Sequence, residues 1–199
     1  MLDHVFMGAI GALRQAFEGA LLERHALEER LQVDILLGDV AWETSYSLPG
    51  EGLPPRVVAE VSLEWPTWSQ ASYRSWRVGE AEGDPPEIDV EIVLRVQRLA
   101  GAPDPAGIMS VLPDEGPALG EEPLHRSTPT VEHHYDADLT PQETAIEVSY
   151  DGLYVLGESA LEDQSALERD FGALGGWIAS TLVRLGDLKL EFRPPEDAV

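Results

Sequence analysis

The chain has 199 residues, 43% of them hydrophobic, which suits one globular domain with a sizeable core and argues against intrinsic disorder. Its 37 acidic and 13 basic residues give a formal net charge of -24, which argues against binding to nucleic acid or anionic membranes because both rely on basic side chains. No cysteine is present, so disulfides, thiol catalysis and cysteine-based zinc sites are excluded.

The acidity has three open interpretations. Dense carboxylates keep proteins soluble in a salt-rich cytoplasm, a high-GC coding bias replaces lysine by arginine, and an acidic surface can mimic nucleic acid and block a basic partner. Lys189 is the one lysine in the sequence. Apolar stretches are too short to span a bilayer, and the first residues lack the positive region of a secretory signal, so a cytoplasmic location is expected.

The first predicted element is a helix over residues 3–31, in which apolar side chains recur at helical spacing. An alternating strand pattern then starts at Val33 and shifts phase near Gly38, which indicates a bulge or a break. Residues 57–65 and 88–96 alternate cleanly and predict two strands, each with one buried face.

The stretch EWPTWSQASYRSW, residues 64–76, concentrates aromatic side chains in a short segment. Pro66 lacks a backbone donor, so the preceding strand should end there. The residues after it alternate again, which predicts a hairpin that turns around residues 67–70. Trp65 and Trp76 are then expected in the core or at its rim.

This predicted hairpin also carries a local positive patch in an otherwise acidic chain. Aromatic side chains and arginines are enriched at binding hot spots, so a partner-binding tip is one hypothesis. Core anchoring of the hairpin and a stacking platform for a carbohydrate or nucleotide are the alternatives. The candidate partner-binding residues are Trp68, Tyr73, Arg74 and Arg77.

Residues 100–129 are rich in proline and glycine and predict a long loop, which either covers the domain or reaches out as an arm or lid. Beyond this loop, residues 131–137 and 146–155 alternate as strands, and a turn is expected at Asp151–Gly152.

The chain closes with a predicted helix over residues 159–185, a short strand over 188–192 and a frayed tail over 194–199. Strands joined by short turns favour antiparallel pairing, and helices at both ends of the chain should cover one sheet face. The sequence therefore predicts a single α+β domain over residues 1–193. Its mostly antiparallel sheet should have about six to seven strands covered by an N-terminal and a C-terminal helix.

Both long predicted helices carry small side chains at every fourth position, which permits close approach of two backbones. Glycine inside a helix costs roughly 1 kcal/mol relative to alanine, so packing should compensate. One interpretation is contact on the sheet or between the helices within one chain, and the other is a symmetric contact between copies. The candidate helix-contact residues are Gly8, Ala12, Ala16, Gly172 and Gly176.

The segment VEHHYDADL, residues 131–139, is the patch of the sequence that most resembles a metal site. On a strand, His134 and Asp136 share one face, so these two are natural co-ligands. His125 is a candidate third ligand. The alternative interpretation is a polar strand edge that faces solvent.

No P-loop, dinucleotide-binding glycine motif, nucleophile elbow or zinc-protease motif occurs in the chain. This favours a non-enzymatic assembly, adaptor or scaffold component, for example of a larger particle. The alternatives are a metal-assisted hydrolase that uses His134 and Asp136, and an acidic inhibitor or immunity-type protein that binds a basic partner. No cofactor is expected. The expected partner is another protein or a second copy, and not nucleic acid or a membrane.

Overall fold

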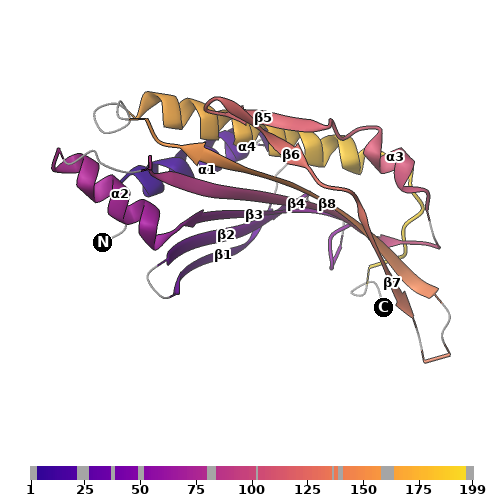
Figure 1. Ribbon diagram of the computed structural model, residues 1–199. Helices are drawn as coiled ribbons and strands as arrows, with labels where there is room; N and C mark the ends of the chain where they lie inside the picture. Colours follow the sequence, from indigo (N-terminus) through magenta and orange to yellow (C-terminus); the bar gives the residue numbers. More distant parts are fainter. Residues whose placement is uncertain are drawn as a thin grey trace.

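The computed structural model describes residues 4–21, 27–36, 39–48, 52–79, 84–101, 103–135, 137–138, 141–157 and 164–195. Within these ranges the chain forms four helices and an eight-stranded antiparallel sheet. Two long helices lie side by side over one face of the sheet (Figure 1). The predicted α+β class, with a helix from each end of the chain flanking an antiparallel sheet, is therefore confirmed.

The helices are α1 (His4–Leu21), α2 (Thr67–Arg77), α3 (Pro105–Met109) and α4 (Ser165–Gly186). The strands are β1 (Leu27–Leu36), β2 (Asp39–Ser47), β3 (Val57–Trp65), β4 (Glu87–Leu99), β5 (Glu115–Leu119), β6 (Glu122–Arg126), β7 (Thr130–Tyr135) and β8 (Pro141–Val155). The sheet order is β1-β2-β3-β4-β8-β6-β5, and β7 pairs with the first half of β8.

The core lies between the sheet and the pair α1 and α4. Strands β2, β3, β4 and β8 point alternate apolar side chains toward the helices, as the sequence alternation predicts. Phe17 of α1 stacks on Tyr46 of β2 with ring centroids 3.7 Å apart, and Phe6 lies 5.7 Å from Trp65. Full burial of one such side chain is worth about 1.5–3 kcal/mol, so this layer supplies most of the driving force for folding.

Helices α1 and α4 touch each other most closely at Gly175. A Cβ atom added to Gly175 would lie 2.4 Å from the carbonyl oxygen of Leu13 and 3.2 Å from the Cβ of Ala16. Gly175 of α4 and Ala16 of α1 thus face each other inside one chain. A Cβ atom added to Gly172 would lie 4.0 Å from the Cβ of Ala16, and one added to Gly176 would meet nothing within 4 Å.

Two predictions for the first half of the chain are wrong. The predicted helix over 3–31 ends at Leu21, and its charged end forms β1, which pairs with β2 from Leu27↔Ser47 to Leu36↔Asp39. Helix propensity is a weak preference that pairing with a neighbouring strand can override. The predicted hairpin at residues 67–70 is helix α2, which begins directly after Pro66. Proline is tolerated at a helix start because the first N–H groups have no intrahelical partner.

Two further predictions are wrong, because a segment expected to be a loop and a residue pair expected to be a turn both form regular secondary structure. The segment 100–129 is not a simple loop, because it contains α3, β5 and β6. Asp104 accepts a hydrogen bond from the N–H of Ala106, and so caps α3. The predicted turn at Asp151–Gly152 lies inside β8, opposite Glu91 and Val90 of β4. Gly152 serves close packing there, since an added Cβ would lie 2.8 Å from Cδ2 of Leu124.

The end of the chain also departs from the prediction. The expected strand over 188–192 makes only one isolated bridge, between Leu99 and Phe192. The predicted tail over 194–199 falls outside the described residues from position 196 onward.

Tyr154 of β8 gives the fold an expected response to alkaline pH. Its buried ring packs edge-on against Phe171 of α4, 5.2 Å between centroids. Burial raises the pKa of Tyr154 to about 12, with a further contribution from the carboxylate of Asp170. The phenol is neutral in both states below pH 10. Above pH 10 the phenol ionises in the unfolded chain but stays mostly neutral in the folded chain. The free energy of unfolding therefore falls as pH rises from 10 to 12.

We expect the free energy of unfolding to fall by about 1–2 kcal/mol over this range through Tyr154. Tyr154→Phe should remove that part of the slope, as measured by urea unfolding at a series of pH values. Tyr135→Phe, a change at an exposed ring, is the matched control. An identical slope in wild type and Tyr154→Phe would contradict the assignment.

Candidate functional site

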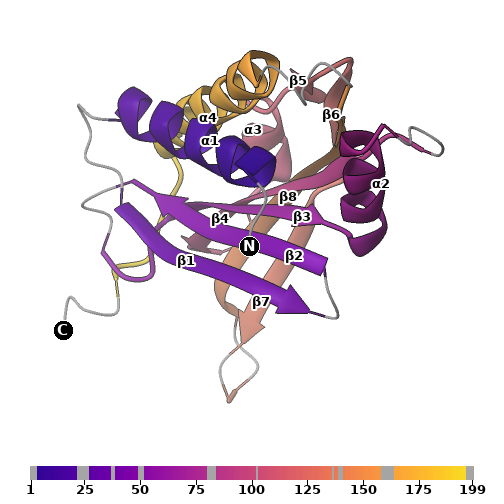
Figure 2. The same cartoon turned by 90° about the vertical axis from the view of Figure 1, so that its left-hand side faces the viewer.

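Helix α2 stands at one end of the molecule, in the connection from β3 to β4 (Figures 1 and 2). Its start is fixed by Asp39, the first residue of β2. One carboxylate oxygen of Asp39 accepts hydrogen bonds from the backbone N–H of Thr67 at 2.5 Å and from its hydroxyl at 2.7 Å. Both hydrogen bonds lower the pKa of Asp39, and the bond from the Thr67 hydroxyl has the larger effect. An anion at a helix N-terminus also suits the helix dipole.

The inner face of α2 is tied to two strands through the fully buried hydroxyl of Ser69. This oxygen accepts from the indole Nε1–H of Trp65 at 2.9 Å and from the backbone N–H of Glu87 at 2.7 Å. It donates to the carbonyl oxygen of Glu87 at 2.6 Å. The Ser69 hydroxyl thus uses its one donor and both of its acceptor positions, and so it fixes α2 against β3 and β4.

Tyr73 belongs to this inner face and not to a binding tip. It is buried one helical turn after Ser69, and its ring meets Trp65 edge-on at 5.5 Å. Trp65 is buried as predicted, and Trp76 is half-buried. The partner-binding hypothesis for Tyr73 is therefore wrong. The spacing of positions 69 and 73, which share a helix face, is the signal that separates them from the outer residues.

Apolar and basic side chains of α2, and the residue directly after it, are exposed to solvent. The side chain of Trp68 is 46% exposed and that of Val78, the residue after the helix, is 72% exposed. Arg74 and Arg77, three positions apart, are exposed on one side of the helix, and a guanidinium N–H of Arg74 donates to Oε1 of Gln70 at 3.2 Å. Trp68 comes nine positions before Arg77, so at about 100° per residue it lies on the other side of the helix axis. We call Trp68, Arg74, Arg77 and Val78 the α2 outer face. Three of these residues stand out in the sequence as aromatic or basic, whereas Val78 does not.

Two of the three predicted metal ligands, His125 and His134, do not come together. His125 of β6 pairs with Asp151 of β8, whereas His134 of β7 pairs with Glu143. Eight residues along one strand correspond to about 26 Å, too far for the two imidazoles to share an ion. Asp136 lies outside the described residues. Across the part of the chain that the structure describes, no group of three His, Asp or Glu side chains is placed to hold a metal ion.

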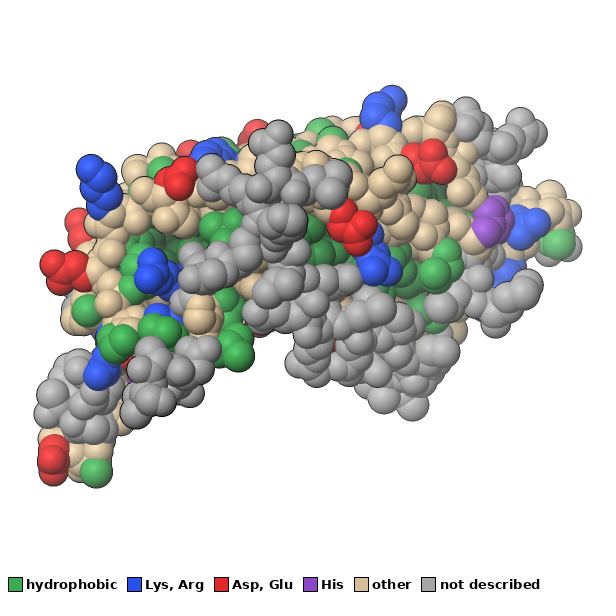
Figure 3. Space-filling view, turned by 180° about the vertical axis from the view of Figure 1, so that it is seen from behind, with side chains coloured by type: hydrophobic (Ala, Val, Ile, Leu, Met, Phe, Trp, Pro, Cys, Tyr) green, Lys and Arg blue, Asp and Glu red, His purple; other side chains and the backbone are tan. Residues whose placement is uncertain are grey.

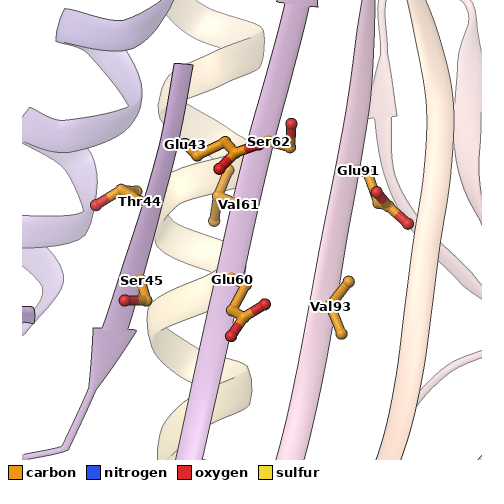
Figure 4. Close-up of a pocket in the computed structure, with 8 residues that line it drawn as sticks. All are labelled: Glu43, Thr44, Ser45, Glu60, Val61, Ser62, Glu91 and Val93. Carbon is orange, nitrogen blue, oxygen red and sulfur yellow. The ribbon is translucent and has the colours of Figure 1, made fainter. Parts of the chain in front are cut away.

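The face of the sheet that α1 and α4 leave open is strongly acidic. A shallow hollow on it, about 230 Å³ in volume, is lined by Glu43, Glu60 and Glu91 from three neighbouring strands (Figure 4). A second hollow beside it is lined by Glu64, Asp89 and Asp151 among others. We call these six residues the acidic sheet face. The outward positions of β3 and β4 could be identified from the sequence alternation, but their alignment with β2 and β8 could not.

Carboxylates on this face oppose one another directly. Glu64 is the cross-strand partner of Asp89, and Glu91 is the partner of Asp151. Like charges placed opposite each other destabilise a sheet. Partial burial raises the pKa of Asp89. The acidic sheet face thus carries repulsion that a cationic partner would relieve.

The structure also has a projecting arm, made of β7 and the part of β8 that pairs with it (Figures 1 and 3). Val131 and Tyr135 are exposed on this arm. Arg95 of β4 forms ion pairs with Glu132 of β7 and Glu147 of β8, which holds the base of the arm to the sheet. His133 is bonded to the hydroxyl of Thr144 at 3.0 Å. The arm thus extends the sheet and is joined to it at its base.

None of the described helices is long and apolar enough to cross a membrane. Comparison of the chain with known family models, curated proteins and solved structures gives no match.

Proposed function

We propose that this protein is a non-enzymatic assembly or adaptor component that acts through protein–protein contacts, with the α2 outer face as its contact surface. The observation that carries the proposal is the exposure of Trp68, Arg74 and Arg77 on one short helix, and of Val78 directly after it, in a chain with net charge -24. Tryptophan and arginine are the residue types most enriched at binding hot spots.

The helix is already fixed before a partner arrives. Asp39 holds its first turn and Ser69 holds its inner face against β3 and β4. Binding to a preorganised surface avoids the cost of ordering a flexible segment, so more of the contact energy appears as affinity. The helix has 11 residues, which corresponds to a length of about 16 Å. Such a surface supports a small, reversible contact.

Association of the purified protein tests the proposal. We expect wild type to form complexes whose mass increases with concentration, and Trp68→Ala to weaken this association roughly tenfold or more. Met7→Ala is the matched control, because Met7 has the same exposed fraction, 46%, but belongs to α1 and not to α2. Light scattering over a concentration series gives the readout. Equal association of Trp68→Ala and wild type would contradict the proposal.

A further inference from the structure

We infer that the α2 outer face docks on the acidic sheet face of a second copy of this chain, so that copies associate head to tail. This inference rests on the proposed function and names its partner. The two surfaces have opposite charge: α2 presents Arg74 and Arg77, whereas the sheet presents Glu60, Glu64 and Glu91 as exposed side chains. Complementary charge of this kind selects partners and fixes their orientation.

The acidic sheet face is open to such a partner. Among the described residues, no helix packs on it, because α1 and α4 both lie on the other side of the sheet (Figures 1 and 2). Its two hollows share Ser62 and Glu91, so they adjoin each other on the face formed by β2, β3, β4 and β8. The face also offers apolar surface to an indole, since Val93 lines the first hollow and Leu153 lines the second.

Arginines from α2 would relieve repulsion that the isolated chain carries. The opposed pairs Glu64–Asp89 and Glu91–Asp151 each place two carboxylates side by side. A guanidinium presents a planar fork of donors that can bind a carboxylate through two hydrogen bonds at once. Each of the two arginines can therefore serve one opposed pair.

The contact joins two different surfaces and is therefore heterologous. A molecule that uses its α2 outer face still has a free acidic sheet face, so association continues into a ring or an open chain of copies. This distinguishes the inference from a symmetric dimer, in which the same surface of both copies is used up.

The net charge of -24 on each copy opposes the contact at long range. The Debye length is about 30 Å at 0.01 M salt and about 8 Å at 0.15 M, so moderate salt screens this repulsion while close ion pairs persist. Association should therefore be stronger at about 0.15 M than at 0.01 M salt, and the contribution of the arginines should shrink toward 1 M.

Two variants, each with one surface reversed, test the inference by sedimentation velocity in about 0.15 M salt. Arg74→Glu/Arg77→Glu reverses the charge of the α2 outer face. Glu64→Arg/Glu91→Arg reverses two charges of the acidic sheet face. Each new arginine has a cross-strand carboxylate of its own to pair with, which favours folding. We expect each variant alone to lose association roughly tenfold or more. An equimolar mixture should associate again, because the intact α2 of the sheet variant meets the intact sheet face of the α2 variant, and the two reversed surfaces are also opposite in charge.

Two controls accompany these variants. Arg74→Lys/Arg77→Lys keeps the charge and should retain association. Glu18→Arg/Glu168→Arg makes the same change of net charge at exposed positions of α1 and α4, and should also retain it. Circular dichroism of every variant establishes that it folds.

The outcomes separate this inference from the proposed function. If the α2 variant loses association while the sheet variant associates like wild type, α2 remains the contact surface and the second-copy inference is overturned. A mixture that stays monomeric also overturns it. If the α2 variant associates like wild type, both statements fail.

Discussion

Gly175→Ala is expected to lower the free energy of unfolding by about 2–3 kcal/mol. The added methyl group would lie 2.4 Å from the carbonyl oxygen of Leu13 and 3.1 Å from the backbone nitrogen of Phe17. Both are backbone atoms, so no side-chain rotation relieves the clash. Helix α1 must move away from α4, which also loosens Phe17 from Tyr46.

The neighbouring glycine provides the control for this prediction. Gly176→Ala adds the same methyl group one position later, where nothing lies within 4 Å. Alanine is the better helix former, so we expect Gly176→Ala to stabilise the protein by up to about 1 kcal/mol. Urea unfolding of the two variants beside wild type measures both effects. A Gly175→Ala variant as stable as wild type would show that α1 and α4 are not packed as described.

Arg98→Met is expected to cost about 3 kcal/mol of stability. The side chain of Arg98 is 2% exposed, at a point where β4 departs from regular pairing with β8. Its guanidinium donates to the carbonyl oxygen of Pro54 at 2.7 Å and to that of Arg193 at 2.6 Å. The backbone of Arg98 also joins the tail, since its carbonyl accepts from the N–H of Arg193 at 2.7 Å.

Methionine approximates the length of this side chain but leaves both carbonyl oxygens without the guanidinium donors. An unsatisfied buried acceptor costs about 1–3 kcal/mol, and two are affected. Arg95→Met on the same strand is the control, because Arg95 is partly exposed and its ion pairs with Glu132 and Glu147 should be worth about 1 kcal/mol or less. Chemical denaturation should therefore give Arg98→Met a much lower free energy of unfolding than Arg95→Met. The reverse ranking would refute a structural role for Arg98.

The parts of the fold that follow local patterns could be predicted from the sequence. Residues 57–65 and 88–96 alternate because one face of β3 and β4 is buried under α1 and α4, and both strands are confirmed. The terminal helices could be placed for the same reason, because each carries one apolar face.

The errors arise where contacts with other elements decide the local structure. Helix α2 depends on Asp39, which lies 28 positions before Thr67 and caps its first turn. Strand β1 depends on pairing with β2. Gly152 resembles a turn residue in sequence, and only its contact with Leu124 explains why a straight strand needs glycine there.

The candidate site shows the same division. Trp68, Arg74 and Arg77 could be selected because aromatic and basic residues stand out in an acidic chain. Tyr73 could not be separated from them, because its burial depends on the helical phase that places it beside Trp65. The acidic sheet face could not be foreseen, because it depends on the register that brings four strands together.

The most direct test of the central claim, that the protein acts through the outer face of α2, is the weight-average mass of wild type, Trp68→Ala and Met7→Ala over one concentration series. The account predicts that the mass of wild type and Met7→Ala increases with concentration, while Trp68→Ala stays near the monomer mass of 21.8 kDa. A wild-type mass that stays at the monomer value, or a Trp68→Ala curve that overlies the wild-type curve, would contradict it.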